Sequence, residues 1–114
     1  MHPVCSIDLD RLPEIRAALT KWVEQVQKRF QLEAVYLFGS FAAGNPHQGS
    51  DIDLVLVGPF TGKLPERIWR VLETTDLPIQ PLCYTSEEWR AMAASENPLA
   101  LEVLRTGRLL FGPG

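Results

Sequence analysis

The segment that most constrains this chain is an apolar run at residues 52–57, with one aspartate inside it and another directly before it. Asp51 and Asp53 stand two positions apart. Because side chains two apart in a strand point to the same face of a sheet, we expect both carboxylates to project together. Two like charges held side by side repel each other, so such a pair normally needs a compensating cation. The run therefore predicts a strand with a metal site at its start.

A second feature lies upstream, where the apolar segment 34–38 predicts a buried strand that runs into Gly39 and Ser40. A glycine-serine turn can offer backbone N–H groups to a phosphate. It can also be a tight turn with an N-capping serine, and the two interpretations are compatible. Ser50 either caps the loop ahead of Asp51 or touches the phosphates. Acids for a metal and a turn for a phosphate together indicate metal-assisted chemistry on a nucleotide.

Size and charge narrow the class of protein. The length of 114 residues predicts a single domain over residues 1–114. The net charge of −3, with Lys and Arg scattered, argues against a nucleic-acid polymer as partner. Neither a signal peptide nor an apolar run near the ~20 residues of a membrane span is visible, so we expect a cytoplasmic protein without a membrane partner. Cys5 and Cys83 could pair, but free thiols are expected.

The rest of the chain predicts an α/β (α+β) fold in which a small mixed sheet is flanked by helices. Apolar residues recur every three or four positions over residues 8–30, the longest predicted helix. Pro78 and Pro81 interrupt the hydrogen-bonding row of a third strand, 77–84, which therefore belongs at an edge or is locally irregular. The other predicted elements are a helical turn at 41–43, a loop at 45–50, a helix at 64–73, a helix capped by Thr85 and Glu88, a helix from Asn97 to Gly107, and a final strand at 109–111.

The order Phe38-Gly39-Ser40, ten residues, then Asp51-Ile52-Asp53 resembles the signature of the DNA polymerase beta-like nucleotidyltransferase superfamily. The chain's size is similar to that of its smallest branch, the minimal nucleotidyltransferases (MNT-type), often encoded beside a HEPN-domain protein. The signature is specific because the turn, the spacing, the acid pair and the apolar flanks must coincide. The resemblance implies that Asp51 and Asp53 are catalytic and hold Mg²⁺, usually as a pair of ions. It also implies that Gly39 and Ser40 cradle the phosphates.

The resemblance further implies a reaction. A hydroxyl attacks the α-phosphorus of a nucleoside triphosphate, with ATP as the expected nucleotide, and pyrophosphate leaves. The acceptor would be a partner protein or a small molecule, and its choice would come from a partner or from an interface between copies of the chain. In the minimal branch some members are antitoxins that modify a HEPN-domain toxin, so a HEPN-like partner and an antitoxin role are implied here.

Two positions depart from the family pattern. Gln80 stands where a third carboxylate is expected, and Ala43 stands where many relatives carry an arginine. A neutral amide can offer a metal its carbonyl oxygen but cannot accept a proton from the acceptor hydroxyl. Loss of such a base typically costs about two to four orders of magnitude in rate. The alternative function is therefore a catalytically impaired nucleotidyltransferase fold that binds a protein or a nucleotide.

Other polar residues near this region have a structural interpretation. Gln80 is either a plain polar side chain on a half-exposed strand or a metal ligand. Glu88 is expected to cap a helix rather than to act as a base. Lys63 and Arg67 are expected at the surface rather than at the nucleotide.

Overall fold

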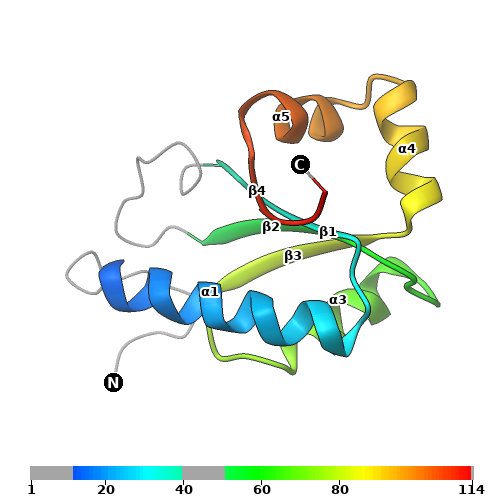
Figure 1. Ribbon diagram of the computed structural model, residues 1–114. Helices are drawn as coiled ribbons and strands as arrows, with labels where there is room; N and C mark the ends of the chain where they lie inside the picture. Colours follow the sequence, from blue (N-terminus) through cyan, green and yellow to red (C-terminus); the bar gives the residue numbers. More distant parts are fainter. Residues whose placement is uncertain (1–11, 40–50, 114) are drawn as a thin grey trace.

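The computed structural model describes residues 12–39 and 51–113, and a mixed sheet lies at its centre (Figure 1). The described strands follow the order β3-β2-β1-β4 across the sheet. Strand β2 is antiparallel to β1 and parallel to β3, and β4 is antiparallel to β1. The bounds are β1 Ala34–Phe38, β2 Ile52–Val57, β3 Ile79–Tyr84 and β4 Arg108–Phe111. This arrangement confirms the predicted α/β class with a small mixed sheet.

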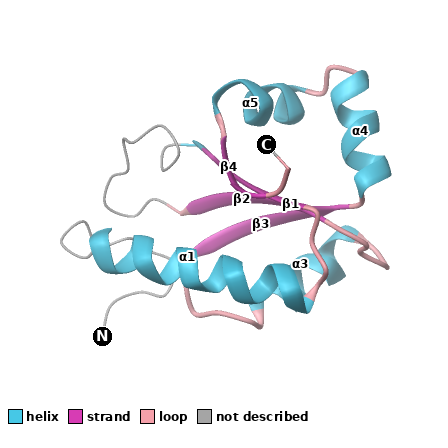
Figure 2. Cartoon of the chain, in the orientation of Figure 1, coloured by secondary structure: helices cyan, strands magenta, loops and turns pink. Residues whose placement is uncertain are grey.

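Helices cover both faces of the sheet (Figure 2). Helices α1 (Leu12–Arg29) and α3 (Leu64–Leu72) lie on one face, and α4 (Ser86–Ala94) and α5 (Pro98–Thr106) lie on the other. Because each face is covered, strand β2 is apolar on both of its sides, as is typical of a strand in the middle of a covered sheet.

The alternation along β2 divides the core into two clusters. Ile52, Leu54 and Leu56 pack with α1 and α3, whereas Val55 and Val57 pack with α4 and α5. Since side chains two apart share a face, Asp53 belongs to the α4 and α5 side of the sheet. The acid pair therefore lies at the start of β2, on the same side of the sheet as α5.

Most of the predicted elements agree with the structure within one or two residues. The third strand begins at Ile79 rather than residue 77, and it does lie at a sheet edge. The first helix spans Leu12–Arg29, whereas residues 8–11 of the prediction lie outside the described residues. The same holds for the predicted helical turn at 41–43 and loop at 45–50. Within the described residues, none of the helices combines the length and apolarity that a membrane span requires.

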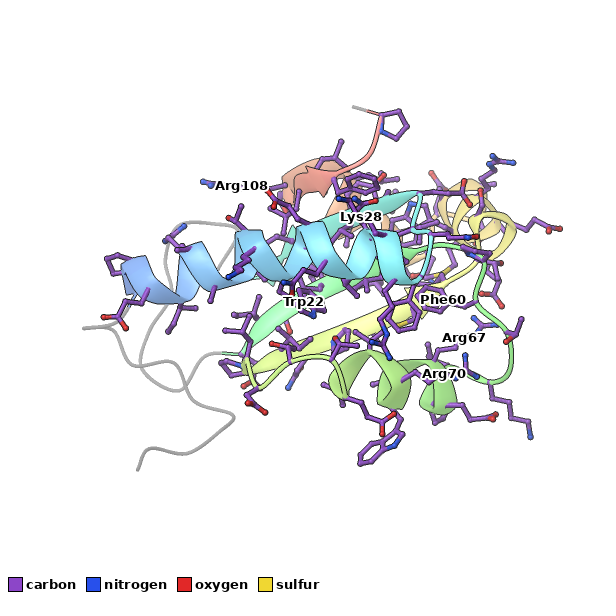
Figure 3. The ribbon with its side chains drawn as sticks, turned by 60° about the horizontal axis from the view of Figure 1, so that its bottom comes forward. Trp22, Lys28, Phe60, Arg67, Arg70 and Arg108 are labelled. Carbon is purple, nitrogen blue, oxygen red and sulfur yellow. The ribbon has the colours of Figure 1, made fainter. Side chains whose placement is uncertain are left out.

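The long helix contributes apolar residues to the core, as its pattern predicts. Trp22 lies between α1 and the strands, where it is buried and its indole Nε1 donates a hydrogen bond to the Thr74 hydroxyl at 2.8 Å (Figure 3). Phe30 at the end of α1 packs against Phe60, with ring centroids 6.0 Å apart. These contacts join α1 to the segments that flank α3.

Cys83 is a buried free thiol on β3, and Cys5 lies outside the described residues. Burial raises the pKa of Cys83 to about 12, with the nearby Arg67 and Arg70 partly opposing the rise. The thiol is therefore protonated at neutral pH, which makes it a poor nucleophile and a core side chain.

Arg67 corrects the expectation of a surface position, because only 8% of the residue is exposed. Its guanidinium donates to the backbone carbonyls of Gly62 and Cys83 and forms an ion pair with Glu88 at 2.7 Å. A buried cation needs such partners, and here they come from three separate segments. Lys63, by contrast, is exposed as expected. Glu88 accepts the backbone N–H of Thr85, which confirms its predicted role as a helix cap.

Candidate functional site

The register of the sheet determines which side chains meet at the acid pair. Asp53 is paired with Phe38 on β1 and with Gln80 on β3. Side chains that are directly paired on neighbouring strands point to the same face, so Gln80 projects beside Asp53. The Gln80 amide Nε2 also donates a hydrogen bond to Asp51 Oδ2 at 2.5 Å. Strand pairing thus places Gln80 beside both acids, although they are far from it in the sequence.

Gly39 lies directly against Asp53, just after the end of β1. Its φ of +75° lies in the left-handed region, which favours glycine. A Cβ atom at this position would overlap with Asp53 Oδ2. Gly39 and Asp53 are therefore neighbours in space, as the motif spacing predicts. Ser40, Ser50 and Ala43 lie outside the described residues.

The electrostatic environment of Asp53 disfavours its charged form. Partial burial raises the pKa of Asp53 above its usual value, and the negative charges of Asp51 and Glu102 raise the pKa further. Each of these effects would be offset by a bound cation. Asp53 is also the acid that lies inside the apolar run, whereas Asp51 directly precedes the run.

Sequence reasoning missed Glu102, which α5 brings within electrostatic reach of Asp53. The sequence contains only an indirect signal for the approach of Glu102 to Asp53. Leu99 and Glu102 are three residues apart and therefore share one side of α5. Leu99 lines an open cavity of about 480 Å³ together with Asp53 and Gln80. This volume falls within the range of about 300–1,000 Å³ that small-molecule sites usually have.

The donor set at the site consists of two carboxylates and one amide. Within residues 12–39 and 51–113, no three His, Cys, Asp or Glu side chains lie close enough together to hold a metal ion by themselves. Glu88, which follows β3 in the sequence, is paired with Arg67 instead. Mg²⁺ is usually bound through one or two carboxylates, with the phosphates of the substrate and water completing its shell. Asp51 and Asp53 therefore fit a Mg²⁺ ion that arrives with a phosphate ligand.

Comparisons with known proteins concern the family and the fold of the chain. The family described as "Polymerase beta, Nucleotidyltransferase" matches residues 20–113. No curated protein matches the chain significantly. Among solved structures, a proposed nucleotidyltransferase from Sulfolobus solfataricus is similar with a TM-score of 0.63 at 20% identity, over 96% of this chain and 87% of that chain.

Two further similar structures are toxin–antitoxin complexes. One was solved with AMP-PNP and has a TM-score of 0.58 at 21% identity, over 82% of this chain and 73% of that chain. The other contains a tri-AMPylated Shewanella oneidensis HEPN toxin with an MNT antitoxin, and has a TM-score of 0.51 at 17% identity, over 82% and 70% of the two chains. At these identities the likeness concerns the fold.

Proposed function

Because this chain belongs to the nucleotidyltransferase family of polymerase beta, we propose that it binds a magnesium–nucleoside triphosphate complex and transfers the nucleotidyl group to a hydroxyl. The observation that carries the proposal is the position of Asp53 directly against Gly39, with Asp51 two residues away, just before the start of β2. ATP is the expected nucleotide.

Each residue of the motif has a distinct part in this proposal. Asp51 and Asp53 would hold the metal ion, whose positive charge would offset the negative charge of the phosphates and of the leaving group. Gly39, Ser40 and Ser50 bind the phosphates through backbone N–H groups and hydroxyls. The acceptor oxygen forms a bond to the α-phosphorus as the bond to the bridging oxygen breaks, and pyrophosphate leaves. In-line geometry therefore depends on how firmly these side chains hold the triphosphate.

The proposed acceptor is a hydroxyl of a HEPN-domain-like protein, for which this chain would be the antitoxin. This part of the proposal is supported by the two similar toxin–antitoxin structures, of which one contains an AMPylated HEPN toxin and the other a nucleotide analogue. A partner protein would also supply the acceptor-binding surface.

A second candidate function is a binding module with little or no turnover. It is favoured by Gln80, which uses its amide N–H to bind Asp51 and has no carboxylate with which to accept a proton. Such a module would bind a nucleotide or a partner protein through the same fold, and complex formation alone would neutralise the partner.

Label transfer from ATP separates the two functions. The protein is incubated with Mg²⁺, ATP labelled on the α-phosphate and a HEPN-domain protein. We expect label on the partner with the wild type and none with Asp53→Asn. Asp76→Asn is the matched control, because Asp76 is exposed and outside the site. If no label is transferred and the partner binds wild type and Asp53→Asn equally well, the binding module is the correct function.

The Gln80→Asp variant tests the missing carboxylate directly. If Gln80 is what limits turnover, restoring an acid at this position should raise the transfer rate by about two to four orders of magnitude. A rate that does not change would mean that the acceptor's proton leaves by another route, such as water.

A further inference from the structure

We propose that Gln80 is a positioning residue that makes this a single-cation site, in which Asp51 and Asp53 hold one divalent ion per bound nucleotide rather than two. The inference rests on the proposed function and specifies its metal requirement. It starts from the hydrogen bond between Gln80 Nε2 and Asp51 Oδ2.

Strand pairing fixes the position of the Gln80 backbone beside the acid pair. Its neighbours Ile79 and Pro81 are buried on the opposite face of the sheet, and β3 pairs with β2 along its whole length. The Gln80 side chain is exposed, but it spans to Asp51, which lies just before β2 begins. The amide thus connects the first acid of the motif to the neighbouring strand and restricts its rotation.

The side chain at position 80 also sets the charge that faces the acid pair. A carboxylate at position 80 would add a negative charge facing the acid pair, whereas the amide group donates its N–H and so presents a partial positive charge toward Asp51. Among the described residues, a second divalent ion would then meet only the same two carboxylates and an N–H dipole that repels it. In two-metal sites the ions lie about 4 Å apart, and such spacing requires anionic ligands to offset their mutual repulsion.

The number of ions that can bind also depends on which carboxylate oxygens of Asp51 and Asp53 remain free. Asp51 Oδ2 already accepts a hydrogen bond from the Gln80 amide, and Asp53 Oδ2 occupies the space that a Cβ atom at Gly39 would fill. Gln80 thus restricts one oxygen of Asp51, and the close approach of Gly39 restricts one oxygen of Asp53. The remaining oxygens can meet one ion, whose other ligands are phosphate oxygens and water. Glu102 contributes negative charge near Asp53 but forms no three-acid cluster with the pair among the described residues.

Manganese is a suitable probe because its electron paramagnetic resonance spectrum distinguishes one ion from two coupled ions. The complex with a non-hydrolysable ATP analogue is titrated with Mn²⁺ and the bound ions are counted. We expect one Mn²⁺ per complex and an uncoupled spectrum for the wild type. For Gln80→Asp we expect a second Mn²⁺ and a spin-coupled spectrum.

Gln80→Ala separates positioning from charge. It removes the hydrogen bond to Asp51 without adding a ligand, so the number of Mn²⁺ ions bound per complex should stay at one. The affinity for Mn²⁺ should fall about tenfold or more, as for other residues that orient metal ligands. Gln25→Ala, on the exposed side of α1, is the matched control and should change neither value. Thermal melts of the metal-free variants check that each has folded.

The outcomes distinguish the two proposals. If the wild type binds two coupled Mn²⁺ ions, or if Gln80→Ala binds Mn²⁺ as tightly as the wild type, the role proposed for Gln80 is wrong. The proposed function would still stand. If the analogue and Mn²⁺ bind no better to the wild type than to Asp53→Asn, the proposed function is overturned and the single-cation site with it.

Discussion

At the scale of single residues, Asp53 shows how a residue of the candidate site can oppose the stability of the fold. Partial burial, the neighbouring Asp51 and the approach of Glu102 all raise the pKa of Asp53, so its anionic form is unfavourable in the metal-free fold. Polar groups that are poorly compensated in the folded protein are common at functional sites, because the ligand supplies the missing partner.

Replacing Asp53 with asparagine should therefore stabilise the metal-free protein. We expect Asp53→Asn to raise the free energy of unfolding at neutral pH by roughly 0.5–1 kcal/mol, since solvent partly screens the repulsion. The folded-state pKa is raised, so the penalty is absent below the unperturbed value of 3.8 and appears as the pH rises through the folded-state pKa. Urea denaturation in EDTA at neutral and acidic pH measures the difference. A variant that is less stable at neutral pH would contradict this account.

Gly39 supports a second prediction at the residue scale. Gly39→Ala should destabilise the protein by about 1–2 kcal/mol, because φ is +75°, and should also weaken nucleotide binding, because the new methyl group overlaps with Asp53. Gly62→Ala is the matched control. Gly62 has a φ of +81°, but its Cβ would meet only the ends of the Arg70 and Glu66 side chains. Equal losses of nucleotide affinity in both variants, measured by calorimetry, would be the contrary result.

At the scale of elements, one ion pair connects α3 to β3 and α4. The Arg67 guanidinium on α3 reaches the Cys83 carbonyl on β3 and the Glu88 carboxylate at the start of α4. Arg67 lies against the outer side of β3, where Pro81 has no N–H to offer another strand. The edge is thus protected from pairing with a further chain.

The ion pair predicts a pH dependence of stability. The hydrogen bond from Arg67, with help from the Thr85 backbone N–H, lowers the pKa of Glu88 below its ordinary value of 4.5. The stabilisation is therefore complete above 4.5 and is lost as the pH falls through the lowered folded-state pKa. Glu88→Gln should cost up to about 1 kcal/mol at neutral pH, since the carboxylate is partly solvated.

Chemical denaturation across the acidic range checks this dependence. The stability curves of wild type and Glu88→Gln should converge as Glu88 becomes protonated. Curves that stay parallel would show that the charge of Glu88 contributes nothing. Glu87→Gln, an exposed neighbour in the first turn of α4, is the control for the general effect of removing a negative charge there.

At the scale of the whole molecule, binding at the site should stabilise the entire fold. The acid pair lies in the sheet, between its two helical layers, so ligand binding is coupled to global unfolding. A ligand at one hundred times its dissociation constant adds about 2.7 kcal/mol to the free energy of unfolding. We expect Mg²⁺ with ATP to raise the melting temperature of the wild type and of Asp76→Asn, but not of Asp53→Asn. An equal shift in all proteins would indicate binding elsewhere.

Much of the fold could be predicted from local patterns. The helix caps at Thr85 and Asn97 were predicted because capping depends on residues a few positions apart, and the structure confirms both. An edge position or a local irregularity was predicted for β3 because proline has no N–H, and the structure places β3 at the edge. The start of β3 was placed two residues early, since the transition from a proline-rich turn to a strand has no sharp local signal.

The sequence by itself determined the elements, the fold class and the proximity of Gly39 to Asp53, because all of these depend on motif spacing and on which residues avoid water. Only the tertiary structure decided which distant side chains complete the site. The Gln80 bond to Asp51 depends on the register of β2 against β3, the approach of Glu102 depends on how α5 crosses the sheet, and the burial of Arg67 depends on three segments meeting. Contacts of this kind arise from packing between elements, so no local pattern in the chain specifies them.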